Sequence, residues 1–242
     1  MSIKKHIPNT ITCGNLLCGC FAIIQALQGN LTAVAFLVGL AAIFDFFDGF
    51  VARLLKVSSP IGKDLDSLAD MVTFGVVPGF VMFHLIKTST VNVFDSNFGN
   101  QMPGVLNYLK YTAFFIPLLS AVRLAKFNND TRQSDSFIGV PTPANAILIC
   151  SLAFILDKHE QFHFLANPFI LALLSLILSL LLVAELPLFA LKFKHFKWKG
   201  NEIRFIFLLT SLIIIISFQI VAIPFIIILY ILFSVFYNKF HR

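Results

Sequence analysis

Carboxylates are concentrated in one short stretch of this sequence, among residues that are mostly apolar. Asp45 and Asp48 are three residues apart, and Asp66 and Asp70 are four apart. Within a helix, either spacing places both carboxylates on one face. Each pair falls in a stretch apolar enough to cross a membrane, where a central carboxylate costs about 2.5–3.5 kcal/mol on insertion scales. Two in one span therefore imply a partner that holds them there.

Divalent cations are the partner that best suits these carboxylates. Four anionic groups in one place repel strongly unless cations hold them, and no basic residue lies among them on the same faces. Hard ions that prefer oxygen ligands, such as Mg²⁺, Mn²⁺ or Ca²⁺, fit this donor set. Four carboxylates can bridge two such ions, which is a common arrangement for displacement at phosphorus. The predicted metal ligands are Asp45, Asp48, Asp66 and Asp70.

Small residues stand next to the carboxylates. Gly49 and Ala52 follow Asp48, and Gly62 precedes Asp66. Small side chains let a ligand approach the backbone closely, which would suit a phosphate-bearing substrate. Close packing of membrane helices uses small residues too, so by themselves these positions do not distinguish the two roles.

The elements that position these residues are expected to be membrane-spanning helices. The 242 residues are 58% hydrophobic and 12% charged, whereas soluble domains carry about 25% charged residues. Lipid tolerates neither open sheets nor exposed irregular loops, so we expect an all-α polytopic bundle. Its eight predicted spans are approximately 9–28, 31–55, 64–86, 105–126, 140–157, 166–189, 203–220 and 222–239.

Two connections and two domains follow from this division. The polar residues 88–104 are expected to form an external loop. The last two spans should form a tight hairpin, because the 37 residues that they cover are too long for one crossing. Residues 1–190 are predicted to form a six-helix catalytic core, and residues 191–242 a basic cytoplasmic loop and a C-terminal helix pair.

Basic residues fix the expected orientation. Of the 18 Lys and Arg residues, 15 fall on the side that holds both termini and the loops after spans two, four and six. The positive-inside rule places that side, and with it the carboxylates, in the cytoplasm. Orientation and attraction to anionic headgroups account for the net charge of +6 without nucleic acid. We expect an integral protein of the cell (inner) membrane, surrounded by membrane lipids, whose active site faces the cytoplasm.

The carboxylate stretch resembles the signature of the CDP-alcohol phosphotransferase family at every fixed position. The matching run is Asp45-Phe-Phe-Asp48-Gly49-Phe-Val-Ala52-Arg53, eight residues, Gly62, three residues, Asp66, three residues and Asp70. The resemblance implies two divalent metal ions, Mg²⁺ or Mn²⁺ with Ca²⁺ as an alternative, held mainly by the first three aspartates. It also implies that Asp70 is the catalytic general base, which takes a proton from the acceptor hydroxyl while CMP leaves.

Further roles are implied by the same resemblance. The CDP nucleotide is expected to contact Asp48, Gly49, Ala52, Arg53, Gly62 and Asp66. Segments 7–19, 65–78, 122–128 and 137–144 are similar to the membrane-embedded phosphatidylserine synthases. That similarity implies CDP-diacylglycerol as donor, L-serine as acceptor and a homodimer. Sister families that use glycerol-phosphate or inositol-phosphate acceptors are the alternative, although a phosphorylated acceptor calls for more basic residues than this region offers.

Arg123 is the main candidate for binding the acceptor's carboxylate or phosphate, since it is expected at the depth of the aspartates. Its other explanation is orientation and snorkelling towards the membrane surface. The polar residues Asn9, Thr10, Asn15 and Asn128 suit recognition and helix capping equally well. The full set of expected acceptor-binding residues is Arg123, Lys126, Asn9, Thr10, Asn128, Pro141 and Thr142.

Two further alternatives concern the acidic residues. A cation transporter also has intramembrane carboxylates, but it would spread them across the membrane and often shows a repeat with broken helices. Here the acids gather at one end and no repeat is found. Glu185, in the predicted sixth span, fits both a functional intramembrane acid and a residue at the cytoplasmic interface.

Overall fold

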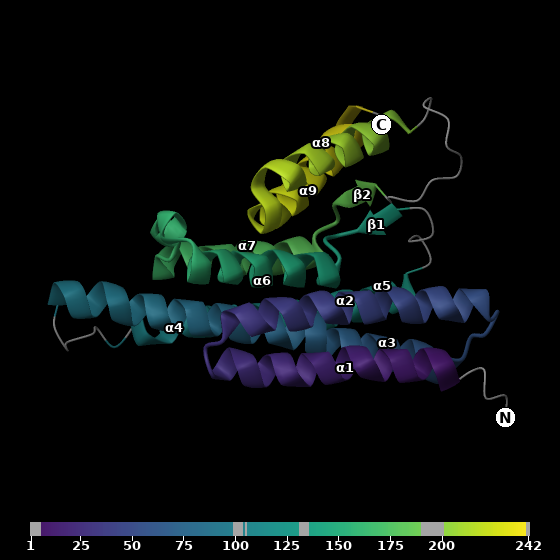
Figure 1. Cartoon of the computed structure of the whole chain (residues 1–242), viewed down its shortest axis with the longest axis horizontal. Coiled ribbons are helices and arrows are strands. Elements are labelled where there is room, and N and C mark those ends of the chain that lie inside the picture. Colours follow the sequence, from purple (N-terminus) through teal and green to yellow (C-terminus); the bar gives the residue numbers. More distant parts are fainter. Residues whose placement is uncertain (1–5, 99–103, 105, 131–135, 190–200, 241–242) are drawn as a thin grey trace.

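The computed structural model describes all residues except 1–5, 99–103, 105, 131–135, 190–200 and 241–242. The described chain is almost entirely helical, which confirms the all-α prediction (Figure 1). Its α-helices are α1 His6–Leu27, α2 Leu31–Leu54, α3 Pro60–Asp70, α4 Val77–Phe98, α5 Phe115–Asn129, α6 Thr142–Lys158, α7 Pro168–Val183, α8 Glu202–Phe218 and α9 Ala222–Phe240.

Shorter segments join these helices. They are the π-helix η2 Met71–Val76 and the 3₁₀ segments η3 Leu106–Phe114, η4 Glu160–Leu165 and η5 Gln219–Val221. Two strands of three residues, β1 Ser136–Ile138 and β2 Pro187–Phe189, pair antiparallel. This small ribbon ties the segment before α6 to the segment after α7.

The helices around the carboxylates begin at clear capping signals. The Asn30 side chain accepts from the backbone N–H of Ala33 at 3.2 Å, at the start of α2. The Ser59 hydroxyl accepts from the N–H of Gly62 at 3.0 Å, and Pro60 opens α3. Caps of this kind satisfy N–H groups that the helix itself leaves free. These caps fix the first residues of the two helices that carry the carboxylate pairs.

The third predicted span belongs to a longer helical column. α3, η2 and α4 follow one another without a break, and the π-helical segment comes directly after Asp70. The prediction of an irregular loop from residue 88 is wrong as far as Phe98, because α4 continues to that residue. Hydropathy marks where a membrane span ends, but residues 88–98 contain neither Pro nor Gly, so nothing in them stops the helix.

The middle of this column, η2 and the first half of α4, lies at the centre of the bundle. Phe74, Val77, Val81, Met82 and Ile86 are fully buried, where η2 and α4 pack against α1, α5, α6 and α7. Helices α6 and α7 lie along α2 and α4, and the α8–α9 pair lies on the far side of α6 (Figure 1). The carboxylate helices are therefore held by a packed core.

The sixth predicted span is shorter than expected. α7 ends at Val183, and the chain then enters β2 instead of remaining helical to residue 189. Pro187 cannot continue a helix, and Gly139 at φ +76 brings the ribbon against the last turn of α7. Glu185 lies beyond the helix end and is exposed, so the structure gives no support to a buried intramembrane acid.

The last two helices form the predicted hairpin. The Phe207 ring of α8 contacts Tyr230 and Phe233 of α9, at centroid distances of 5.7 and 6.4 Å. The chain reverses direction between the two helices near residue 220, where Gln219 adopts φ 50. The basic residues 191–199 that precede α8 fall outside the described residues.

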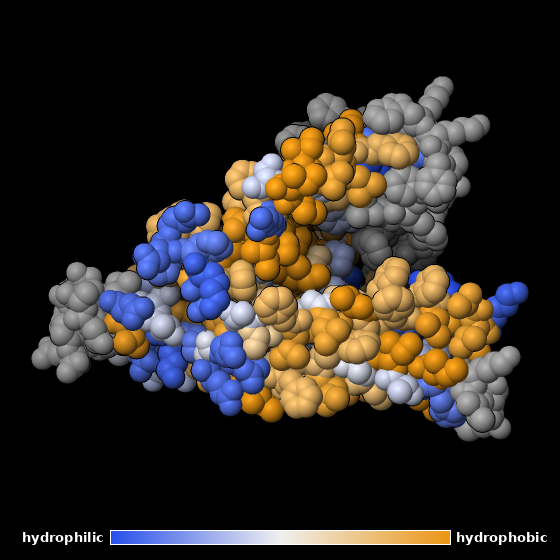
Figure 2. Space-filling view, in the orientation of Figure 1, coloured by the Kyte–Doolittle hydropathy of each residue, from blue (hydrophilic) through white to orange (hydrophobic). Residues whose placement is uncertain are grey.

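The described surface suits a lipid environment. By length and composition, four helical stretches of the described chain are long and apolar enough to cross a membrane: His6–Leu27, Leu31–Leu54, Pro60–Asn92 and Glu202–Val235, the last of which contains both α8 and most of α9. Large apolar side chains are exposed along them, and Figure 2 shows hydrophobic residues over most of the visible face with hydrophilic residues towards its ends. Exposed apolar surface on this scale marks a membrane protein.

Candidate active site

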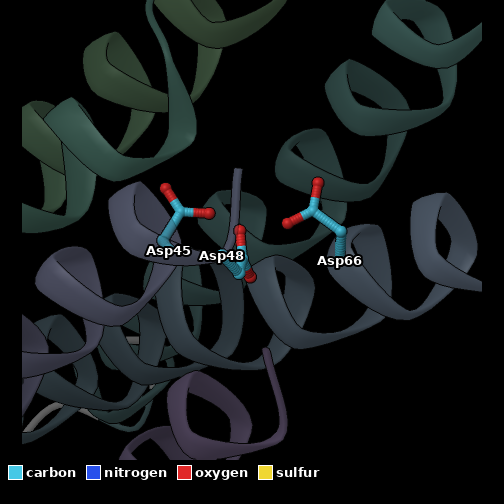
Figure 3. A group of neighbouring side chains, drawn as sticks. All are labelled: Asp45, Asp48 and Asp66. Atoms are coloured by element: carbon cyan, nitrogen blue, oxygen red, sulfur yellow. The ribbon is translucent and has the colours of Figure 1, made fainter. Parts of the chain in front are cut away.

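Three of the predicted metal ligands meet between two helices. Asp45 and Asp48 of α2 and Asp66 of α3 each offer a carboxylate oxygen, and these oxygens lie within 4.8 Å of one another. Figure 3 shows the three side chains directed into one shared space. The opposite face of α2 is apolar: Phe46 and Phe50 stack on each other at 6.2 Å and are exposed.

Asp70 lies beside this group and not inside it. Its carboxyl group is within hydrogen-bonding reach of the Asp45 carboxyl group. The Asn15 amide nitrogen donates to Asp70 Oδ1 at 3.2 Å. Of the four aspartates, Asp70 is thus the one that adjoins the cluster and also accepts a hydrogen bond from a side-chain amide.

Helix α1 positions the carboxylates through two buried polar side chains. Thr12 Oγ1 donates to Asp48 Oδ2 at 2.6 Å, and Asn15 holds Asp70. They are three residues apart and share one face of α1, which packs against both α2 and α3. Carboxylate spacing does not predict Thr12. The available signal was the pair of polar residues, Thr12 and Asn15, one turn apart in a helix predicted to span the membrane.

A pocket of about 270 Å³ opens beside the cluster. Five of the six residues predicted to contact the nucleotide line it: Asp48, Gly49, Ala52, Gly62 and Asp66. The remaining lining residues are Pro8, Asn9, Thr12, Val57, Ser58, Ser59 and Lys63. Most of the residues predicted to contact the nucleotide therefore surround one space, next to the carboxylates.

Arg53 is the nucleotide candidate that does not line this pocket. It is exposed, and its Nη1 would lie 3.4 Å from a Cβ added at Gly49. At Gly62, an added Cβ would lie 3.0 Å from Ser59 Oγ and 3.1 Å from Asn9 Oδ1. Glycine at position 62 therefore keeps the pocket wall open, as a close ligand approach requires.

One acceptor candidate, Arg123, lies near Asp70, and a second, Thr142, contacts Arg123. Arg123 is buried, and its guanidinium is close enough to Asp70 for their charges to interact. Its Nη1 donates to Thr142 Oγ1 at 3.2 Å, and the guanidinium also stands over the Phe127 ring at 5.2 Å. A buried arginine in this position is held by its partners and is not explained by snorkelling alone.

The other acceptor candidates lie elsewhere. Asn9 lines the pocket beside the carboxylates. Thr10 is exposed and donates to the His6 carbonyl at 2.9 Å, and Lys126 is exposed. Pro141 is half-buried at the N-cap position of α6. The structure therefore does not gather the predicted acceptor residues into one group.

Asn128 has a structural role in the described chain. Its amide nitrogen donates to Ser67 Oγ at 2.7 Å, and its carbonyl accepts from Lys63 Nζ at 2.9 Å. These bonds join the end of α5 to α3, and Lys63 also lines the pocket beside the carboxylates. The contact fixes the spacing of two helices that carry site residues.

The three-carboxylate group fits divalent cations. All its donors are oxygens, which hard divalent ions prefer. Within the described residues, no Lys or Arg nitrogen is placed in an ion pair with any of these three side chains. Three adjacent carboxylates without a cation would repel one another, so the donor set itself calls for positive charge.

Comparison with known proteins points to the same chemistry. A family model described as CDP-alcohol phosphatidyltransferase matches residues 5–184. The CDP-diacylglycerol–serine O-phosphatidyltransferase of Bacillus subtilis is 33% identical over 198 residues, covering 82% of this chain and 95% of that protein. The protein of the same name from Helicobacter pylori is 32% identical over 208 residues, covering 85% and 80%. An archaetidylserine synthase of Methanothermobacter thermautotrophicus is 32% identical over 148 residues, covering 60% and 56%.

Proposed function

Because this chain belongs to the CDP-alcohol phosphatidyltransferase family, we propose that it transfers the phosphatidyl group of CDP-diacylglycerol to the hydroxyl of L-serine, forming phosphatidylserine and releasing CMP. The observation that carries the proposal is the similarity to serine phosphatidyltransferases over 95% of the Bacillus subtilis protein. The grouped carboxylates and the adjoining pocket support it independently.

The carboxylate group would hold the two divalent metal ions of the reaction. Asp45, Asp48 and Asp66 would be the main ligands, and Asp70, which lies beside Asp45, would add a fourth carboxylate. Mg²⁺ and Mn²⁺ suit the all-oxygen donor set best, and Ca²⁺ is the alternative. When bound, such ions neutralise charge on the diphosphate and on the leaving group.

The residues of the chain orient the two substrates. The nucleotide occupies the pocket beside Gly49, Ala52 and Gly62, where small side chains allow it to approach the backbone. Asp70 accepts the proton of the serine hydroxyl, and that oxygen forms a bond to the lipid-side phosphorus. The bond from this phosphorus to the CMP oxygen breaks, and CMP leaves with the electron pair. Asn15 keeps Asp70 aligned for the proton transfer.

The membrane arrangement is part of the proposal. Eight spans with both termini in the cytoplasm would place the pocket at the cytoplasmic face of the cell membrane, where CDP-diacylglycerol and serine meet. The excess of Lys and Arg on that side supports this orientation. Residues 1–190 would form the catalytic core, residues 191–242 would add the helix pair, and two copies would form a homodimer.

An acceptor panel tests the reaction. Purified protein is supplied with CDP-diacylglycerol, Mn²⁺ or Mg²⁺, and in turn labelled serine, glycerol 3-phosphate or inositol phosphate. We expect labelled phosphatidylserine and an equal amount of CMP with serine alone. A chelator should stop the reaction, and either ion should restore it. Turnover with glycerol 3-phosphate but none with serine would overturn the acceptor assignment, and full activity in strong chelator would overturn the metal site.

A further inference from the structure

Polar atoms without hydrogen-bond partners are concentrated near Asp70. Six buried side-chain N or O atoms lack a partner among the described residues, and five of them belong to Asn15, Ser120, Arg123 and Asn145. These four side chains are 0%, 0%, 7% and 1% exposed. Buried polar groups are nearly always paired, because leaving one unpaired costs free energy. Five such atoms in one part of the bundle indicate a place built to receive a polar ligand.

Asn15 of α1 and Ser120 of α5 both lie against η2. Thr73 Oγ1 donates to the Asn15 carbonyl at 3.2 Å. A Cβ added at Gly75 would lie 3.1 Å from Ser120 Cβ. The π-helical segment therefore lies close to α1 at Thr73 and close to α5 at Gly75. Segments of this kind are frequent at functional sites.

Arg123 of α5 and Asn145 of α6 are the other two side chains with unpaired polar atoms. Arg123 lies one turn beyond Ser120 on the same face of α5 and donates to Thr142 of α6. Asn145 lies one turn beyond Thr142 on the same face of α6. Both its amide atoms lack a partner in the described chain, as does Arg123 Nε. Helices α1, α5 and α6 all pack against η2, which begins at the residue after Asp70.

We infer that Asn15, Ser120, Arg123 and Asn145 form an acceptor niche that binds the charged head of an amino acid, with its hydroxyl directed at Asp70. The inference rests on the proposed function and adds the residues that recognise the acceptor. Arg123 binds the carboxylate, because a guanidinium presents paired donors to such a group. The oxygens of Asn15, Ser120 and Asn145 accept hydrogen bonds from the ammonium group, and the Asn145 amide nitrogen adds a donor for the carboxylate.

The composition of the niche favours a zwitterion over a phosphorylated acceptor. It combines one buried cation with neutral groups that both donate and accept. An amino acid needs both kinds of partner, whereas a phosphate ester carries about two negative charges and would call for further buried cations. Lys126 lies nearby in sequence but is exposed, so it does not supply one.

Substitutions on two helices test the niche. In Asn145→Leu and Ser120→Ala, we expect the KM for serine to rise about tenfold or more, since each removes a hydrogen bond to a charged group. The KM for CDP-diacylglycerol should stay within about twofold, because the nucleotide pocket is elsewhere. Ser151→Ala is the matched control: Ser151 is a buried serine of α6 whose hydroxyl donates to the Leu148 carbonyl at 3.0 Å. It should leave both KM values unchanged.

Acceptor analogues separate recognition from stability. Ethanolamine lacks only the carboxylate of serine, and 3-hydroxypropanoate lacks only its ammonium group. Arg123→Gln should lower the preference for serine over ethanolamine, measured as a ratio of kcat/KM, by about tenfold or more. Asn145→Leu should similarly lower the preference for serine over 3-hydroxypropanoate. A merely structural role would change neither ratio.

The measurements distinguish a failure of the niche from a failure of the proposed function. If the niche variants lower the melting temperature but leave the serine KM and both preferences unchanged, the group has only a structural role and the inference is overturned. If Asn145→Leu cannot be recovered from membranes, Asn145→Ala is measured in the same way and decides the matter. Absence of serine turnover in the unsubstituted protein, with turnover of another acceptor, would contradict the proposed function instead.

Discussion

Among single side chains, Asp70 differs from the other aspartates of the signature in its surroundings. Asp45, Asp48 and Asp66 face one another, whereas Asp70 adjoins Asp45 and accepts from Asn15. An aspartate at the edge of a metal group can reach a hydroxyl on its free side. This position suits proton transfer better than a place between two ions would.

Replacing Asp70 with Asn should abolish proton transfer while keeping the size of the side chain. We expect CMP release to fall about 10²–10⁴-fold, the range that general-base catalysis contributes, with the protein still folded. Asp64→Asn is the matched control, because Asp64 is an exposed acid of the same helix outside the cluster. Unchanged turnover in Asp70→Asn would remove the base assignment.

Gly62 lines the pocket that we propose for the nucleotide. In Gly62→Val, the added side chain would meet Ser59 and Asn9, since even a Cβ lies 3.0–3.1 Å from them. We expect the KM for CDP-diacylglycerol to rise about tenfold, with a much smaller change for serine. Gly39→Val is the control, because a Cβ there has nothing within 4 Å. Equal effects on both substrates would argue against a nucleotide role for this pocket.

Among the elements, the two carboxylate helices were the most predictable part of the molecule. The spacing of Asp45, Asp48, Asp66 and Asp70 predicted which helix faces they share. The lengths of the apolar stretches predicted the membrane spans. Sequence could not predict the π-helical register of η2, because a π-helix depends on packing from several helices and not on local preference. The hydrogen bond from Thr12 to Asp48 also depends on how α1 packs against α2, so the sequence alone does not predict it.

The ends of the helices were predicted less well than their existence. Hydropathy ended the third span near residue 86, yet α4 continues to Phe98. It also extended the sixth span to residue 189, whereas α7 ends at Val183. In the first case the helix outlasts its apolar stretch, and in the second a strand pairing beyond residue 186 competes with the helix. Neither effect is encoded in average hydropathy.

The β1–β2 ribbon offers a test of how the helix ends are joined. Gly139 has φ +76, and a Cβ there would collide with the Leu182 carbonyl oxygen. Gly139→Ala should therefore destabilise the protein by about 1–3 kcal/mol, measured as a lower melting temperature in detergent. Gly14→Ala, whose Cβ would meet the Phe44 ring at an ordinary 3.6 Å, should change it far less. Equal melting temperatures for the two variants would contradict the close approach.

For the whole molecule, the proposed orientation puts the two ends of the bundle in different compartments. In a background with the exposed Cys13 and Cys20 replaced by Ser and the buried Cys18 and Cys150 retained, one cysteine is added at Lys56, after α2, or at Lys158, the last residue of α6. We expect a membrane-impermeant thiol reagent added to intact cells to label the cysteine at position 158 and not the one at position 56, following the positive-inside rule. Permeabilised cells give the control, in which both react. The reverse pattern would invert the topology.

Helix α2 places its carboxylates on one face and the exposed rings of Phe46 and Phe50 on the other. The donor's acyl chains can therefore stay among neighbouring lipids while its diphosphate is held a helix width away. Such an enzyme meets its donor by lateral diffusion in two dimensions. Its rate should depend on the mole fraction of CDP-diacylglycerol in the membrane or micelle and not on its bulk concentration, so diluting the donor with inert detergent at constant total donor should slow turnover.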